Sequence, residues 1–148
     1  MKTTPDKPVG QFKGVKASLW RWVPALAMMA LIFGASSLPG KEVPNFGVWD
    51  LLAKKGGHAL GYALLGASYL GGLAAGRRLS WPLAALALAG AALYAVTDEF
   101  HQTFVSGRHP SPVDVLIDAG GAAAGVAVWA FIRTRVRPAR LRRPSTPR

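Results

Sequence analysis

The sequence contains no cysteine, and only seven of its 148 residues are acidic. The absence of cysteine excludes disulfides, thiolate metal ligands and a cysteine nucleophile. The acidic residues are outnumbered by 18 lysines and arginines, which gives a formal net charge of +11. Such a charge is compatible with nucleic-acid binding, but zinc-finger, RNP and helix-turn-helix patterns are missing. We therefore expect no nucleic-acid partner.

The apolar residues, 51% of the chain, are gathered in long blocks that short basic clusters separate. Each block has about the length that an α-helix needs to cross a bilayer. A soluble bundle would need polar outer faces at helical spacing, which the last three blocks lack along most of their length. We therefore predict an all-α fold, a four-transmembrane-helix bundle. Its helices cover residues 20–38, 56–76, 81–105 and 112–132.

The first block has an alternative interpretation as a cleaved signal peptide, with Ala35 to Ser37 as a loose cleavage site. Its long basic flank and long apolar core favour a retained helix instead. Residues 15–133 then form one membrane domain. Residues 1–14 and 134–148 are polar or basic flanks, and we expect both to be disordered.

The positions of lysine and arginine predict the orientation of the bundle. Fourteen of the 18 lie in the N-terminal flank, at Arg77 and Arg78, or in the C-terminal tail. With four spans these regions share one side of the membrane, which the positive-inside rule assigns to the cytoplasm. Both termini are thus predicted to be cytoplasmic, and the loops at 41–55 and 106–112 face outward. Membrane lipid is the expected partner.

Polar residues from three separate segments fall at the outward-facing ends of these predicted helices. A carboxylate inside a membrane costs several kcal/mol unless it is paired or hydrated, so such residues are functional candidates by default. Four acids face one certain cation, Arg108, which leaves the site short of positive charge. Either some carboxyl groups are protonated, or a divalent metal or a cationic part of a substrate completes the site. The candidates are His58, Tyr62, Asp98, Glu99, Gln102, Arg108, Asp114 and Asp118.

Helical spacing predicts which way these side chains point. Asp114, Asp118, Gly121 and Gly125 form one stripe, so the face that packs through glycine also carries the carboxylates. Structural alternatives remain for single members. His58 and Tyr62 could serve packing alone, Asp98 could pair with Arg108, Asp114 could cap its helix, and Glu99 could face headgroups, while His101 and His109 could be solvated.

Taken together, these motifs resemble the VanZ-like family of bacterial membrane proteins. The resemblance covers about residues 50–128 and rests on H-x3-Y-x2-LG from His58 and on TDEFHQTFVSGRHPSPVDVLIDAGGAAAG from Thr97. Asp118 departs from it, because asparagine is expected there. The resemblance implies a multi-pass protein of the bacterial cytoplasmic membrane and cell envelope. The family takes its name from a member linked to teicoplanin resistance, but it implies no settled molecular activity.

Three functions fit the sequence. The first is a site that binds a lipid headgroup, a glycopeptide antibiotic or an envelope intermediate; transport through so few helices would need a homo-oligomer. The second is a membrane-embedded hydrolase or transferase acting on a lipid-linked phosphate. The third is a structural envelope protein. No complete catalytic motif or metal-ligand motif is present and no cofactor is specified, so we rank binding first.

Each candidate residue takes a role under these hypotheses. In an enzyme, His58 and the acids would supply acid-base chemistry, and Arg108 would hold a phosphate or carboxylate. In either an enzyme or a binding protein, the remaining polar groups would contact the ligand. The catalytic candidates are His58, Asp98, Glu99, Arg108 and Asp114. The substrate-binding candidates are Tyr62, Gln102, Arg108 and Asp118.

Overall fold

The structure, a computed structural model, describes residues 19–40 and 48–136. Within these ranges the chain forms four α-helices and no strand, which confirms the predicted all-α fold. The helices are α2 (Val23–Ser36), α3 (Val48–Leu73), α4 (Trp81–Gln102) and α5 (Pro112–Val136).

The helix boundaries differ from the predicted apolar blocks at several ends. Helix α3 begins at Val48 rather than near Gly56, because Leu, Ala and Lys before the block are strong helix formers. It ends at Leu73, close to Gly76, whose φ of 72° breaks the helical path. The predicted tail at 1–14 lies outside the described residues, as does most of 134–148, whose first residues continue α5.

Prolines mark the starts of three helices. Pro24 and Pro82 lie in the first turns of α2 and α4, and α5 opens at Pro112. A proline suits this position because the first amide groups of a helix have no partner within it. Ser111 caps α5, since its Oγ accepts a hydrogen bond from the Val113 amide over 3.2 Å.

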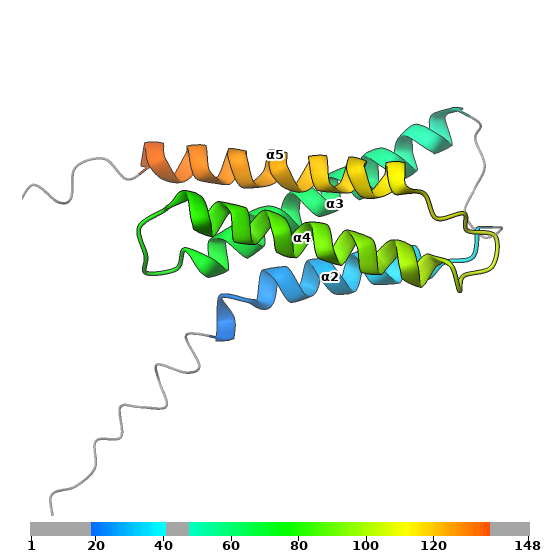
Figure 1. Ribbon diagram of the computed structural model, residues 1–148, viewed down its shortest axis with the longest axis horizontal. Coiled ribbons are helices and arrows are strands. Elements are labelled where there is room, and N and C mark those ends of the chain that lie inside the picture. Colours follow the sequence, from blue (N-terminus) through cyan, green and yellow to red (C-terminus); the bar gives the residue numbers. More distant parts are fainter. Residues whose placement is uncertain (1–18, 41–47, 137–148) are drawn as a thin grey trace, which may run out of the picture.

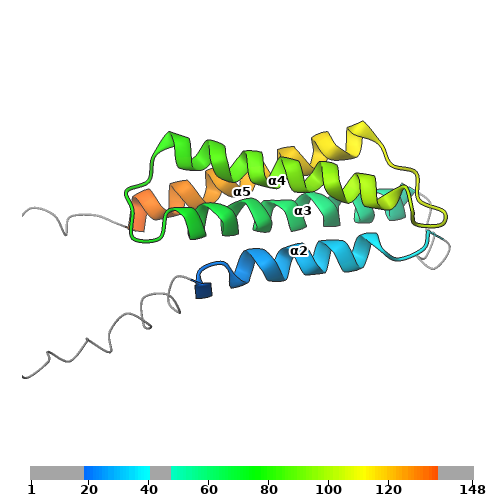
Figure 2. The same ribbon diagram turned by 60° about the horizontal axis from the view of Figure 1, so that its bottom comes forward.

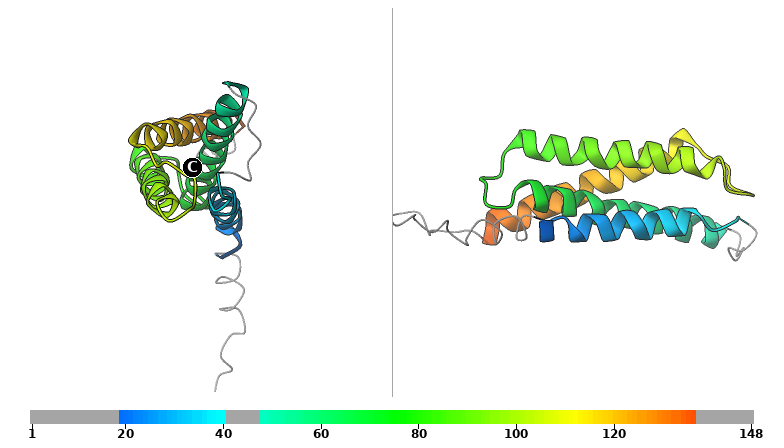
Figure 3. Two further views of the ribbon diagram at one scale, coloured as in Figure 1. Left: turned by 90° about the vertical axis from the view of Figure 1, so that its right-hand side faces the viewer. Right: turned by 90° about the horizontal axis from the view of Figure 1, so that it is seen from below.

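The helices lie side by side along the long axis, and α3 packs against α2, α4 and α5 (Figure 1). The start of α2, the turn between α3 and α4 and the end of α5 lie at one end of the bundle (Figure 2). The end of α2, the start of α3 and the loop between α4 and α5 lie at the other, which we call the site end. The view along the axis shows α3 beside both α2 and α5 (Figure 3).

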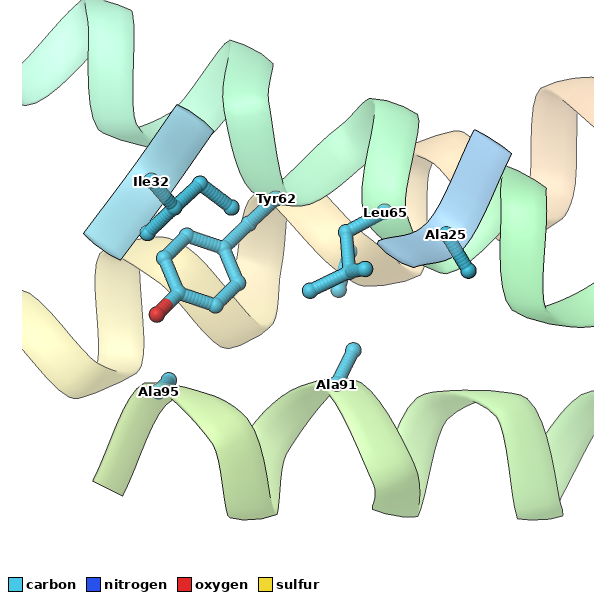
Figure 4. Packing of buried hydrophobic residues seen from close by; sticks show 7 residues of the cluster. Ala25, Ile32, Tyr62, Leu65, Ala91 and Ala95 are labelled. Carbon is cyan, nitrogen blue, oxygen red and sulfur yellow. The ribbon is translucent and has the colours of Figure 1, made fainter. Parts of the chain in front are cut away.

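The interior combines small apolar residues with buried polar ones. On α4, Ala95 faces the aromatic ring of Tyr62 and Ala91 faces the side chain of Leu65, both from α3 (Figure 4). Ser36, Asp98 and Asp118 are buried as well. The surface, in contrast, exposes large apolar side chains along every helix. Examples are Leu26, Leu64, Leu93, Leu116 and Phe131. Buried polar groups beneath an apolar exterior are the arrangement expected of helices in lipid.

Length and composition give α4 and α5 the character of membrane helices. Their most apolar windows have mean hydropathies of 1.4 and 1.9, whereas α2 is apolar but has only 14 residues. Helix α3 does not meet the same test, because glycines, Lys54, Lys55 and His58 reduce its hydropathy. Helix α3 also has the most extensive packing of the four helices, above all against α5, so less of its surface needs to be apolar.

Candidate functional site

The candidate site begins with close packing between α3 and α5. A Cβ atom on Gly121 would overlap the backbone of Ala59, and one on Gly125 would overlap the backbone of Ala63. The two helices therefore approach to a distance that only glycine permits on α5. This contact brings His58, next to Ala59 in the chain, against the first turns of α5.

His58 faces Asp118 across this contact. Its Nδ1 atom lies 3.6 Å from Oδ2 of Asp118, which is only 1% exposed. Neither carboxylate oxygen of Asp118 has a hydrogen-bond partner within the described part of the chain. A buried carboxylate without donors is costly, so this group depends on the neighbouring imidazole or on a donor brought by a ligand.

Asp98 belongs to a separate buried network. Its Oδ2 accepts a hydrogen bond from Ser36 Oγ over 2.8 Å and another from Gln102 Nε2 over 3.2 Å. Arg108 does not supply these bonds. Its Nε and Nη2 atoms donate instead to the carbonyls of Leu38 and Ala35, over 3.1 and 2.8 Å. Arg108 therefore does not form the alternative pair with Asp98. Its guanidinium instead bonds to carbonyl groups at the end of α2.

Glu99 is turned into the bundle rather than toward headgroups. It is 7% exposed, and its Oε2 accepts the Ser111 amide over 2.9 Å. This bond ties α4 to the start of α5. Asp114 does not cap α5, because Ser111 does, and instead forms an ion pair with Lys55 of α3.

A cavity of about 290 Å³ opens among these residues at the site end. Six of the eight predicted site residues line it: His58, Glu99, Gln102, Arg108, Asp114 and Asp118. Asp98 is not part of its wall but accepts a hydrogen bond from Gln102, which is. Tyr62 is not part of the wall either; it is fully buried against Ile32 and Ala95, and its hydroxyl has no partner among the described residues (Figure 4).

Sequence reasoning missed three residues that the structure brings to this region. Lys54 and Lys55 line the cavity, and Ser36 donates to Asp98. The sequence does contain a signal for Lys54. It is four residues before His58, so the two share a helix face. With both lysines included, Lys54, Lys55 and Arg108 balance Glu99, Asp114 and Asp118 on the cavity wall. The predicted shortage of positive charge is therefore wrong for the cavity.

The other two histidines have different surroundings. His101 stacks on Phe33 with ring centroids 4.4 Å apart, and its Nε2 lies 3.1 Å from Ser37 Oγ. His109 is exposed and lies at the cavity wall. Across residues 19–40 and 48–136, no three acidic or histidine side chains are arranged to hold a metal ion.

These features define a small all-helical protein with membrane-helix character and a charged cavity at one end of its bundle. The chain belongs to the VanZ/LLP1 family, whose model matches residues 21–133. The match covers all four helices except the last residues of α5. Searches among curated proteins and among solved structures found no match.

Proposed function

We propose that this VanZ/LLP1-family chain is a multi-pass protein of the bacterial cytoplasmic membrane. All four helices span the bilayer, and both termini face the cytoplasm. The support is twofold. Arg77, Arg78 and the arginines of α5's last turn lie at the end opposite the cavity, and the helix surfaces around the bundle are apolar. The cavity then opens at the outer face.

The function we propose is binding of the phosphate-bearing head of a lipid or lipid-linked envelope intermediate. One observation carries it: a cavity whose wall combines Lys54, Lys55 and Arg108 with three acids. Cations suit a phosphate, and carboxylates suit the hydroxyl or amine groups that such heads also carry. A volume of about 290 Å³ admits a headgroup. It would enclose only part of a glycopeptide antibiotic, so any link to glycopeptide resistance would act through an envelope lipid.

Binding of a soluble headgroup tests this function. The probe is glycerol 3-phosphate, titrated against the purified full chain in detergent. Lys54→Met removes a cation from the cavity wall, so we expect Kd to rise about tenfold, the effect of losing one charged hydrogen bond. Arg77→Met, which removes a charge from the opposite end, is the matched control and should leave Kd unchanged. No binding by the unaltered chain, or equal weakening by both variants, would contradict the proposal.

A second candidate function, hydrolysis of a lipid-linked phosphate, is favoured by the contact between His58 and Asp118. A carboxylate beside Nδ1 orients the imidazole, whose Nε2 can then accept a proton from water. The water oxygen would bond to phosphorus as the bond to the lipid oxygen breaks, and the proton would pass to that leaving oxygen. Release of inorganic phosphate from 1-oleoyl-glycerol 3-phosphate, abolished in His58→Ala, would support this function. Stoichiometric binding without release would exclude it for that substrate.

A further inference from the structure

A second cavity, of about 370 Å³, adjoins the charged one and lies between α2 and α3. Its walls are almost entirely apolar. Met28, Leu31, Ile32, Ala35 and Leu38 come from α2 and its end, and Gly57 and Gly61 come from α3. We call this cavity the groove.

The groove and the charged cavity meet at three residues. Lys54, His58 and Arg108 line both. Among the described residues that line the groove, these three alone are ionisable, so its polar end is entirely basic. The acids Glu99, Asp114 and Asp118 line the charged cavity but not the groove. The two cavities together thus pass from the apolar groove, through the basic junction of Lys54, His58 and Arg108, to Glu99 and Asp118. We call the region around these two acids the acidic recess.

The two glycines of the groove differ from those that bring helices together. A Cβ on Gly57 would meet nothing within 4 Å, and one on Gly61 would meet only the Ile32 side chain, at 3.4 Å. Both positions therefore have room for a side chain, whereas Gly121 and Gly125 have none. Helix packing does not account for a glycine at position 57. The lack of a side chain at Gly57 leaves the groove open.

We propose that the groove holds the hydrocarbon chain of the lipid whose head occupies the charged cavity; this inference rests on the proposed function. The phosphate lies at the basic junction formed by Lys54, His58 and Arg108. A hydroxyl of the head reaches the acidic recess, where both buried oxygens of Asp118 lack a donor among the described residues. The ligand class is a lipid phosphate with a hydroxyl-bearing head, and it enters sideways from the bilayer between α2 and α3.

Two probes that share a head separate the groove from the charged cavity. Glycerol 3-phosphate carries the head alone, and 1-oleoyl-glycerol 3-phosphate adds one chain. For the full chain in phosphatidylcholine nanodiscs, we expect the oleoyl probe to bind about tenfold tighter or more, because its chain inserts into the bilayer and packs in the groove, which holds the head beside the charged cavity. Because partition of the probe into the bilayer is the same for every variant, Gly57→Leu, which fills the groove, should reduce this difference while leaving glycerol 3-phosphate binding unchanged.

Gly120→Leu is the matched control, because Gly120 is exposed on α5 and lies outside the groove, and a Cβ atom added to it would meet nothing within 4 Å. It should keep the preference for the oleoyl probe. Ala35→Leu fills the groove from α2 and should have the same effect as Gly57→Leu. It keeps the test valid if the Gly57→Leu protein does not fold. If the unaltered chain binds the head but shows no preference, or if the groove variants keep it in full, the groove assignment is wrong and the proposed function stands. Binding of neither probe overturns both.

Discussion

His58 and Asp118 face each other from neighbouring helices, with Nδ1 and Oδ2 3.6 Å apart and the carboxylate almost completely buried. Residues this far apart in the chain meet because α3 and α5 pack through glycine on α5. The contact places an ionisable pair at the cavity wall, where each partner determines the cost of burying the other.

The pair should show strong energetic coupling. His58→Ala leaves a buried carboxylate without its neighbour and should lower the free energy of unfolding by about 1–3 kcal/mol. Asp118→Asn removes the buried charge and should have little effect on stability or increase it. In the double variant the loss caused by His58→Ala should largely disappear. Thermal unfolding of the four proteins in detergent measures the cycle, and additive effects would show that the two residues do not interact.

Gly125 should be the least replaceable glycine of the bundle. In Gly125→Ala the new Cβ overlaps the backbone of Ala63, which cannot move as a flexible side chain can. We expect a loss of about 1–3 kcal/mol or failure to fold. Gly120→Ala introduces the same methyl group where nothing lies within 4 Å, and should be neutral or slightly stabilising. Size-exclusion profiles and melting temperatures compare them; equal behaviour would refute the close-packing account.

Ser36 should contribute to stability through Asp98. Ser36→Ala removes the hydrogen bond of 2.8 Å to a buried carboxylate, and we expect a loss of about 1–3 kcal/mol. Ser68→Ala is the matched control, because the Ser68 hydroxyl donates only to the Leu64 carbonyl of its own helix over 2.7 Å. That change should stay within about 0.5 kcal/mol. A Ser36→Ala protein as stable as the control would mean that the network carries little energy.

The proposed orientation can be tested by cysteine labelling, because the native chain has no cysteine. Ser106→Cys lies in the loop at the site end, and Ser80→Cys lies in the turn between α3 and α4; both positions are exposed. In intact spheroplasts a membrane-impermeant maleimide should label Ser106→Cys, but should label Ser80→Cys only after permeabilisation. The reverse pattern would invert the orientation, and labelling of both in intact cells would contradict a spanning bundle.

Much of the fold was predictable, because long apolar blocks between basic clusters have few other solutions. The residues at which the helices begin and end were harder to predict. Helix α3 extends back to Val48 through residues of high helix propensity that a hydropathy pattern leaves out. The stop at Leu73 depends on a positive φ at Gly76, and on sequence grounds many other glycines of this chain could have supplied it equally well.

The convergence of polar residues at one end was also predictable, since helix direction and spacing determine depth and face. The partners were not. Arg108 bonds to carbonyls at the end of α2, and Asp98 bonds to Ser36, in contacts between residues more than 60 positions apart. Such partners depend on how helices rotate against one another, which spacing within one helix cannot specify. For the same reason Tyr62 was expected at the ligand and lies in the core.

The fastening of the site end has a mechanical consequence. The Gly40 amide donates to the Ser106 carbonyl over 3.0 Å, and Arg108 from the same loop bonds to the end of α2. Helix α2 is thereby fixed to the loop that follows α4, so the two should shift as one body. Widening of the groove beside α2 must then come from displacement of α3, and exchange of a lipid chain would be limited by how readily Lys55 releases Asp114.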